Sequence, residues 1–126
     1  MSIAEQKDLL SRVAQRIFEE ATNSSLGSTF HIIISFHLQN KFGKDPYEVL
    51  IDNPKTFHDG LKEVLGEGAE AVINLVGTYL TIKYDVDCTA EEFTGLFTKD
   101  SVSSTQKLSG IFGSIITQEE QKLKTA

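Results

Sequence analysis

The chain has two prolines, and each follows a residue that commonly caps helices. Asp45-Pro46 and Asn53-Pro54 place a side-chain oxygen directly before a proline. Asp and Asn side chains accept hydrogen bonds from the free amides at a helix start, and proline suits the first helical turn. Both pairs therefore predict helix starts: a short helix after Asp45, and a longer one from Pro54 to a stop at Gly66.

Apolar residues recur at helical spacing through most of the remaining sequence. Capping boxes at Ser2–Glu5 and Thr89–Glu92 predict two further helix starts, and residues 68–84 and 106–123 have long amphipathic patterns. With 126 residues, the chain fits one domain. We therefore predict an all-α fold, a compact bundle of five or six helices with a single core over residues 1–126.

Two segments are harder to interpret. Leu26–Phe42 is rich in β-branched and aromatic residues, so part of it could be a strand. Its apolar positions also fit a buried helical face, with Gly43 as the helix-ending residue, and we favour the helix. Residues 98–105 are polar and serine-rich, which is typical of a linker. They would connect a docking C-terminal helix over residues 106–123. The apolar positions expected on the buried face of the earlier segment are Phe30, Ile33, Ile34, His37, Leu38 and Phe42.

The charge distribution argues against a nucleic-acid partner. The net charge is −6, and residues 45–92 hold eleven acidic and three basic residues, a net charge of −8. Such an acidic centre repels phosphate, and no cluster of Lys or Arg compensates for it. Cys88 is the single cysteine, so no intramolecular disulfide can form. No export signal and no apolar run of the ~20 residues needed to span a bilayer is visible. We therefore expect a cytoplasmic protein with no membrane association.

Two motifs resemble ligand sites but lack the required context. Residues 66–71 match the dinucleotide fingerprint G-x-G-x-x-A, which requires a strand before the first glycine. The preceding residues have helical periodicity, so we interpret Gly66 as the stop between two helices, with a positive φ. Asp85-Val86-Asp87 begins like a calcium loop, but the sixth position is Ala90 and the twelfth is Leu96. Neither motif therefore predicts a site.

The residue types of catalytic and metal centres are present without their usual spacing. His31 and His37 lie about 120° apart on a helix and cannot share one ion from that helix alone. His37 is expected at the core or its boundary. Cys88 precedes a helix start, which lowers a thiol pKa, but the sequence places no base beside it. We predict no catalytic, metal or cofactor-binding residues, and the chain is expected not to be an enzyme.

The terminal helices contain a predicted association surface. The apolar stripe of the last helix cannot stay exposed on a soluble monomer, so it must cover the chain's own core or a second copy. Gly110 and Gly113 would allow another helix to approach closely. We predict a homodimer in which both terminal helices take part. The candidate residues are Leu10, Val13, Ile17, Leu108, Ile111, Phe112, Ile115 and Ile116.

Residues from Leu26 to Tyr84 resemble an archaeal family of unknown function, described as a Nitrososphaera-type signal-output domain. The resemblance implies a compact helical module in signalling or regulation and transfers no catalytic residue. It rests on His37-Leu38, Phe42-Gly43, Asn53-Pro54, Phe57, Leu61, Leu65-Gly66 and Gly68-Ala69.

We therefore expect a non-enzymatic interaction or signal-output module that binds a protein partner or a second copy. The alternative is a sensor that holds a small apolar ligand between helices, with a metal as a less favoured ligand. Aromatic residues could line such a cavity. The candidates are Phe30, Phe36, Tyr79 and Tyr84.

Overall fold

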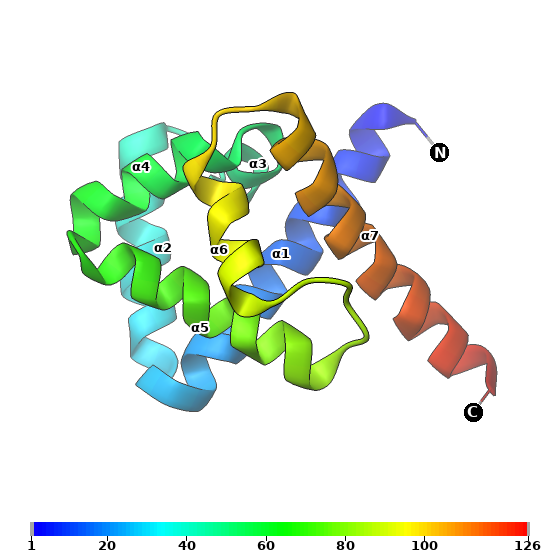
Figure 1. Ribbon diagram of the computed structural model, residues 1–126. Helices are drawn as coiled ribbons and strands as arrows, with labels where there is room; N and C mark the ends of the chain where they lie inside the picture. The colour runs from blue at the N-terminus through cyan, green and yellow to red at the C-terminus, as the bar shows by residue number, and fades with distance from the viewer. Residues whose placement is uncertain (1, 126) are drawn as a thin grey trace.

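The computed structural model describes residues 2–125, which form helices joined by loops (Figure 1). The all-α prediction is confirmed, but five or six helices is too low a count, because residues 2–125 contain seven. The two short helices, α3 and α6, are separate elements, each with its own capping side chain. The helices are α1 (Ile3–Leu26), α2 (Ser28–Phe42), α3 (Pro46–Asp52), α4 (Pro54–Leu65), α5 (Gly68–Lys83), α6 (Ala90–Thr98) and α7 (Val102–Thr125).

The predicted helix starts are confirmed by hydrogen bonds from backbone amides to the capping side chains. The Asp45 carboxylate accepts from the amide of Tyr47 at 3.0 Å. The Asn53 side chain accepts from the first amides of α4 at 3.1 and 3.2 Å. Thr89 and Glu92 form the predicted reciprocal capping box at 3.1 Å in each direction. The caps therefore set the starts of α3, α4 and α6.

Glycines end two of these helices in the predicted way. Gly43 closes α2 with a φ of 71°, and Gly66 closes α4 with a φ of 62°. Positive φ is unfavourable for residues that carry a β-carbon. Gly66 therefore lies between two helices, α4 and α5, as predicted, and the dinucleotide fingerprint has no strand before its first glycine.

Helix α1 runs through the middle of the bundle and packs on α2, α3, α5 and α7 (Figure 1). Its Phe18 ring centroid lies 5.6 Å from Phe57, 5.7 Å from Tyr47 and 6.4 Å from Phe97. Aromatic pairs prefer this edge-on arrangement, which adds to the free energy of burial. One core cluster collects buried side chains from all seven helices of the described residues.

The predicted linker over residues 98–105 is shorter in the structure. Helix α6 extends to Thr98, and α7 begins at Val102 instead of residue 106. The Ser101 hydroxyl accepts from the amide of Ser104 at 3.1 Å, which is the pattern of a helix cap. The serine-rich composition predicted a linker over residues 98–105, but Ser101 caps the start of α7. None of the helices in the described part of the chain combines the length and the hydrophobicity needed to cross a bilayer.

Candidate association surface

Six of the eight residues of the predicted association surface are buried in the chain's own core, and the other two are half-buried against it. Helices α1 and α7 pack on each other in the same chain. Their facing stripes are therefore covered within one copy and present no free surface to a second. Leu10 and Ile116 are half-buried, and the buried residues are Val13, Ile17, Leu108, Ile111, Phe112 and Ile115.

Gly110 and Gly113 do not pack against another helix of the same chain. A β-carbon at either position would meet no heavy atom of the described residues within 4 Å. Close packing occurs at two other glycines. A β-carbon at Gly77 would lie 3.1 Å from Cα of Ala90, and one at Gly60 would overlap the Phe42 ring. Gly77 therefore allows close packing between α5 and α6, and Gly60 allows it between α2 and α4, both inside the bundle.

Helix α2 is rotated relative to the orientation predicted from its sequence. His31 and Leu38 are its buried residues, whereas Ile33 and His37, both expected to face inward, are exposed. Hydrophobic residues occur on all sides of α2, so periodicity gives no direction for its core-facing side. Contacts with α1, α3 and α4 select the buried side instead.

The rotation leaves a row of large apolar side chains in solvent. Ile32 is 67% exposed, Ile33 47% and Phe36 62%. A helix that is apolar on all sides is normally surrounded by protein. One side of α2 is therefore unpartnered in the monomer. We call the exposed residues on this side the α2 face: Thr29, Ile32, Ile33, Phe36, His37 and Asn40.

An apolar groove lies beside the start of α2 and has a volume of about 380 Å³. Leu26 and Phe30 form one wall, and Leu65 and Leu75 belong to the other. Leu26 itself is 50% exposed. The groove is therefore a separate apolar site between the start of α2 and α5.

The α2 face is uncharged although the chain as a whole is acidic. Helix α2 contains no Asp or Glu, and its one lysine, Lys41, forms an ion pair with Glu63 of α4. On the buried side, Nε2 of His31 lies 3.8 Å from the Glu19 carboxylate and its ring stacks on Tyr47 at 6.1 Å. Burial lowers the pKa of His31, against the opposing effect of Glu19. Because α2 has no carboxylate, charge repulsion between the α2 face and another acidic protein is smaller than elsewhere on the surface.

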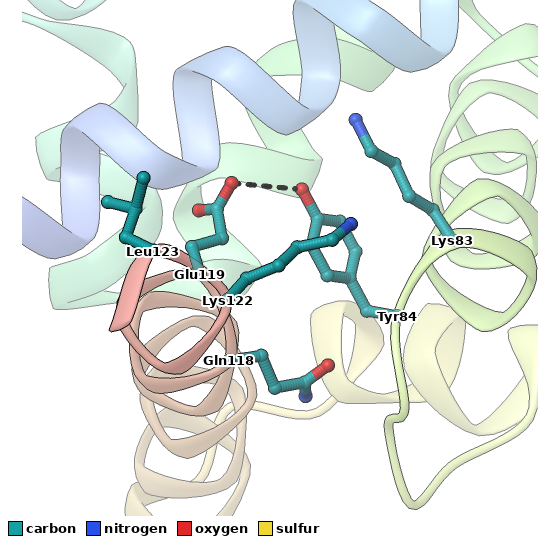
Figure 2. Close-up of a pocket in the computed structure, with 6 residues that line it drawn as sticks. All are labelled: Lys83, Tyr84, Gln118, Glu119, Lys122 and Leu123. Atoms are coloured by element: carbon teal, nitrogen blue, oxygen red, sulfur yellow. Dashed lines mark hydrogen bonds between the residues drawn. The ribbon is translucent and has the colours of Figure 1, made fainter. Parts of the chain in front are cut away.

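A second concave site lies between the end of α5 and the C-terminal half of α7 and has a volume of about 530 Å³. In Figure 2 the side chains of Tyr84 and Glu119 point towards each other, and their oxygens are 3.4 Å apart. The pocket is lined by Lys83, Tyr84, Gln118, Glu119, Lys122 and Leu123.

The polar groups around this pocket are bonded to one another. The Arg16 guanidinium donates to Glu119 and, at 3.5 Å, to Tyr84. Burial disfavours the charged guanidinium, but these hydrogen bonds and the Glu119 charge raise the pKa of Arg16. Hydrogen bonds from Lys83 to Glu20, at 2.8 Å, and to Tyr79 raise the pKa of Lys83. The network ties α1, α5 and α7 together and holds these charges in pairs.

The four aromatic residues expected to line a ligand cavity are dispersed. Tyr84 lines the pocket between α5 and α7, whereas Phe30 lines the groove beside α2. Phe36 is exposed on the α2 face, and Tyr79 donates a hydrogen bond to Glu20. The structure therefore does not bring these rings together around one cavity.

The metal-binding residue types are also dispersed. Among the described residues, no three His, Cys, Asp or Glu side chains gather as metal ligands would. Both ring nitrogens of buried His58 lack a hydrogen-bond partner in the described part of the chain. Carboxylate oxygens of Asp59 and Glu70 lie 3.7 and 3.8 Å from nitrogens of this ring. Burial raises the pKa of the Cys88 thiol, which opposes formation of a reactive thiolate.

Comparisons with known proteins give no further assignment. No family model matches the sequence, and no curated protein or solved structure matches the chain.

Proposed function

We propose that this chain is a non-enzymatic association module and that the α2 face is its docking surface. The observation that carries the proposal is the exposure of Ile32, Ile33 and Phe36 on a helix without a carboxylate. Burying a large apolar side chain of this kind contributes about 1.5–3 kcal/mol. Ile32, Ile33 and Phe36 are about half to two-thirds exposed, so burial of the three contributes about that share of this free energy each. Recognition by a helix laid on an apolar surface is a common mode of protein association.

The family resemblance supports the same role. It covers Leu26 to Tyr84, and α2 lies within that range. A signal-output module acts by contacting another protein, and the α2 face has the composition that such a contact requires. We therefore propose signal output as the biological setting, with the α2 face as the part that contacts the next component.

A photocrosslinking experiment tests the docking surface. A benzophenone amino acid replaces Phe36 in one variant and Ile82 in a control variant, and the cells that naturally encode the protein are irradiated. Ile82 is 81% exposed on α5, so both probes meet solvent in the monomer. We expect a discrete crosslinked species from position 36 and none from position 82. If neither variant gave a crosslinked species after irradiation, the proposal would be refuted.

The pocket between α5 and α7 supports a second candidate function, a sensor for a small, partly apolar ligand. Its volume of about 530 Å³ lies in the range of small-molecule sites. A ligand that binds there raises the melting temperature, and Leu123→Glu should abolish that rise. Leu123 is 80% exposed, so its replacement leaves the core intact. No rise across a panel of apolar compounds would remove this candidate.

A further inference from the structure

We infer that the partner on the α2 face is a second copy of this chain, packed with its α2 antiparallel to the first. This inference rests on the proposed function, because it names the occupant of the same surface. Figure 1 shows α2 along the side of the bundle away from α7. Helix α7, which was predicted to dimerise, is therefore not part of this contact.

The sequence of the α2 face is complementary to itself. Thr29, Ile33, Phe36 and Asn40 follow one another at intervals of four, three and four residues, and all four are exposed. These intervals are those of the facing positions in paired helices. In a two-fold symmetric contact, if one residue contacts a second residue of the other copy, that second residue also contacts the first residue of the other copy. With the axis between Ile33 and Phe36, each Ile33 meets Phe36 of the other copy.

The same symmetry places polar residues together at the two ends. Thr29 of each copy lies opposite Asn40 of the other, so a hydroxyl meets an amide, and the two can form a hydrogen bond. Ile32 lies opposite His37 on the flank of the contact. The apolar centre is thus bounded by polar pairs at both ends, which resembles the arrangement of specific interfaces.

Electrostatics favours the antiparallel over the parallel arrangement. No residue of the α2 face is acidic, and none is Lys or Arg, so two chains of net charge −6 can approach there. In a parallel pair the helix dipoles would be aligned unfavourably, whereas in an antiparallel pair they oppose each other. The second copy is therefore expected to run in the opposite direction.

The available area predicts a weak, reversible dimer. An aromatic side chain has roughly 150–250 Å² of surface and an isoleucine less, and the three exposed residues are about half to two-thirds accessible. Together they bury roughly 600 Å² over two copies, and the flanking residues bring the contact near the ~1,000 Å² of the smaller specific interfaces. We therefore expect dissociation constants on the order of 1–100 μM.

Sedimentation of the purified full chain over this concentration range measures the dimer. Ile33→Ser should raise the dissociation constant about a hundredfold, because symmetry places the substitution in the contact twice. Ile82→Ser is the matched control, an equally simple change of another exposed isoleucine, and should leave the constant unchanged. A wild-type chain that stays monomeric at several hundred micromolar would overturn the inference. In that case a crosslink from position 36 to a different protein would still support the proposed function.

Disulfide trapping tests the direction of the second helix. On a Cys88→Ser background, chains carrying Thr29→Cys are mixed with chains carrying Asn40→Cys and oxidised. We expect the mixed disulfide, because these positions face each other in the antiparallel pair. In a parallel pair they would be displaced by about 16 Å along the axis, at 1.5 Å per residue, well beyond disulfide reach. A disulfide between two Thr29→Cys chains, without the mixed species, would overturn the antiparallel arrangement.

Discussion

Replacing Gly77 by alanine tests the closest packing between two helices of the bundle. Alanine in a helix interior is favoured over glycine by about 1 kcal/mol. The new β-carbon would lie 3.1 Å from both Cα of Ala90 and Cδ1 of Phe93, and 3.2 Å from the Ala90 carbonyl oxygen. Phe93 is fully buried, and Ala90 is the first residue of the capped helix α6, so neither can easily withdraw. Overpacking of this kind costs about 1–3 kcal/mol.

The net effect of Gly77→Ala is therefore between no change and a loss of about 2 kcal/mol in the free energy of unfolding. Gly110→Ala is the matched control, since its β-carbon would meet no described heavy atom within 4 Å. That variant should gain about 1 kcal/mol. Urea denaturation measures the free energy of unfolding of both variants, provided that its dependence on urea concentration is the same for both. The difference between the two changes gives the packing cost at Gly77. Equal gains in the two variants would refute the close contact between α5 and α6.

Three further predictions concern the core, the protonation of α2 and the loop before α6. Phe112→Ala should lower the free energy of unfolding by about 3–5 kcal/mol in denaturation experiments on dilute monomer, whereas Phe36→Ala should change it by less than about 0.5 kcal/mol. Because burial lowers the pKa of His31, the folded chain binds fewer protons there than the unfolded chain, and stability should fall as the pH drops through and below the usual imidazole range. His31→Gln should flatten that part of a series of thermal melts, and an unchanged series would contradict the assignment. The Gln118 side chain accepts from the Asp85 amide at 3.1 Å and donates to the Asp85 carbonyl at 2.8 Å. Gln118→Ala should therefore speed amide hydrogen exchange in the loop before α6. An unchanged exchange rate would show that these two hydrogen bonds do not hold the loop.

The parts of the fold that could be predicted are those with local causes. Asp45, Asn53 and Thr89 cap helices through side chains a few residues from the amides they bind, and Gly43 and Gly66 adopt conformations that favour glycine. Such signals are visible in a short stretch of sequence. Ser101 gives the same type of signal, but it stands among other serines, and the helix start was missed.

The exposed apolar side of α2, the proposed association surface, could not be predicted because its cause is not local. An apolar stripe on α7 requires a cover, and the sequence does not distinguish α1 of the same chain from a second copy. Ile33 and His37 face solvent because α1, α3 and α4 select which side of an evenly apolar helix is buried. The composition of α2 nevertheless indicated that part of its apolar surface would stay exposed. A helix that is hydrophobic on all sides but located at the edge of a small bundle has more apolar surface than one core can cover.

The packing of α7 against α1 has a consequence for synthesis. A ribosome makes α1 before α7, so the part of α1 on which α7 packs stays uncovered until α7 has emerged. Until that point the nascent chain exposes this part of α1 and the apolar side of α2 at the same time. Exposed surface of this kind is where incomplete chains aggregate and where chaperones bind. Completion of the core thus has to await the synthesis of α7, and premature stops in α7 should yield insoluble chains rather than shortened, folded ones.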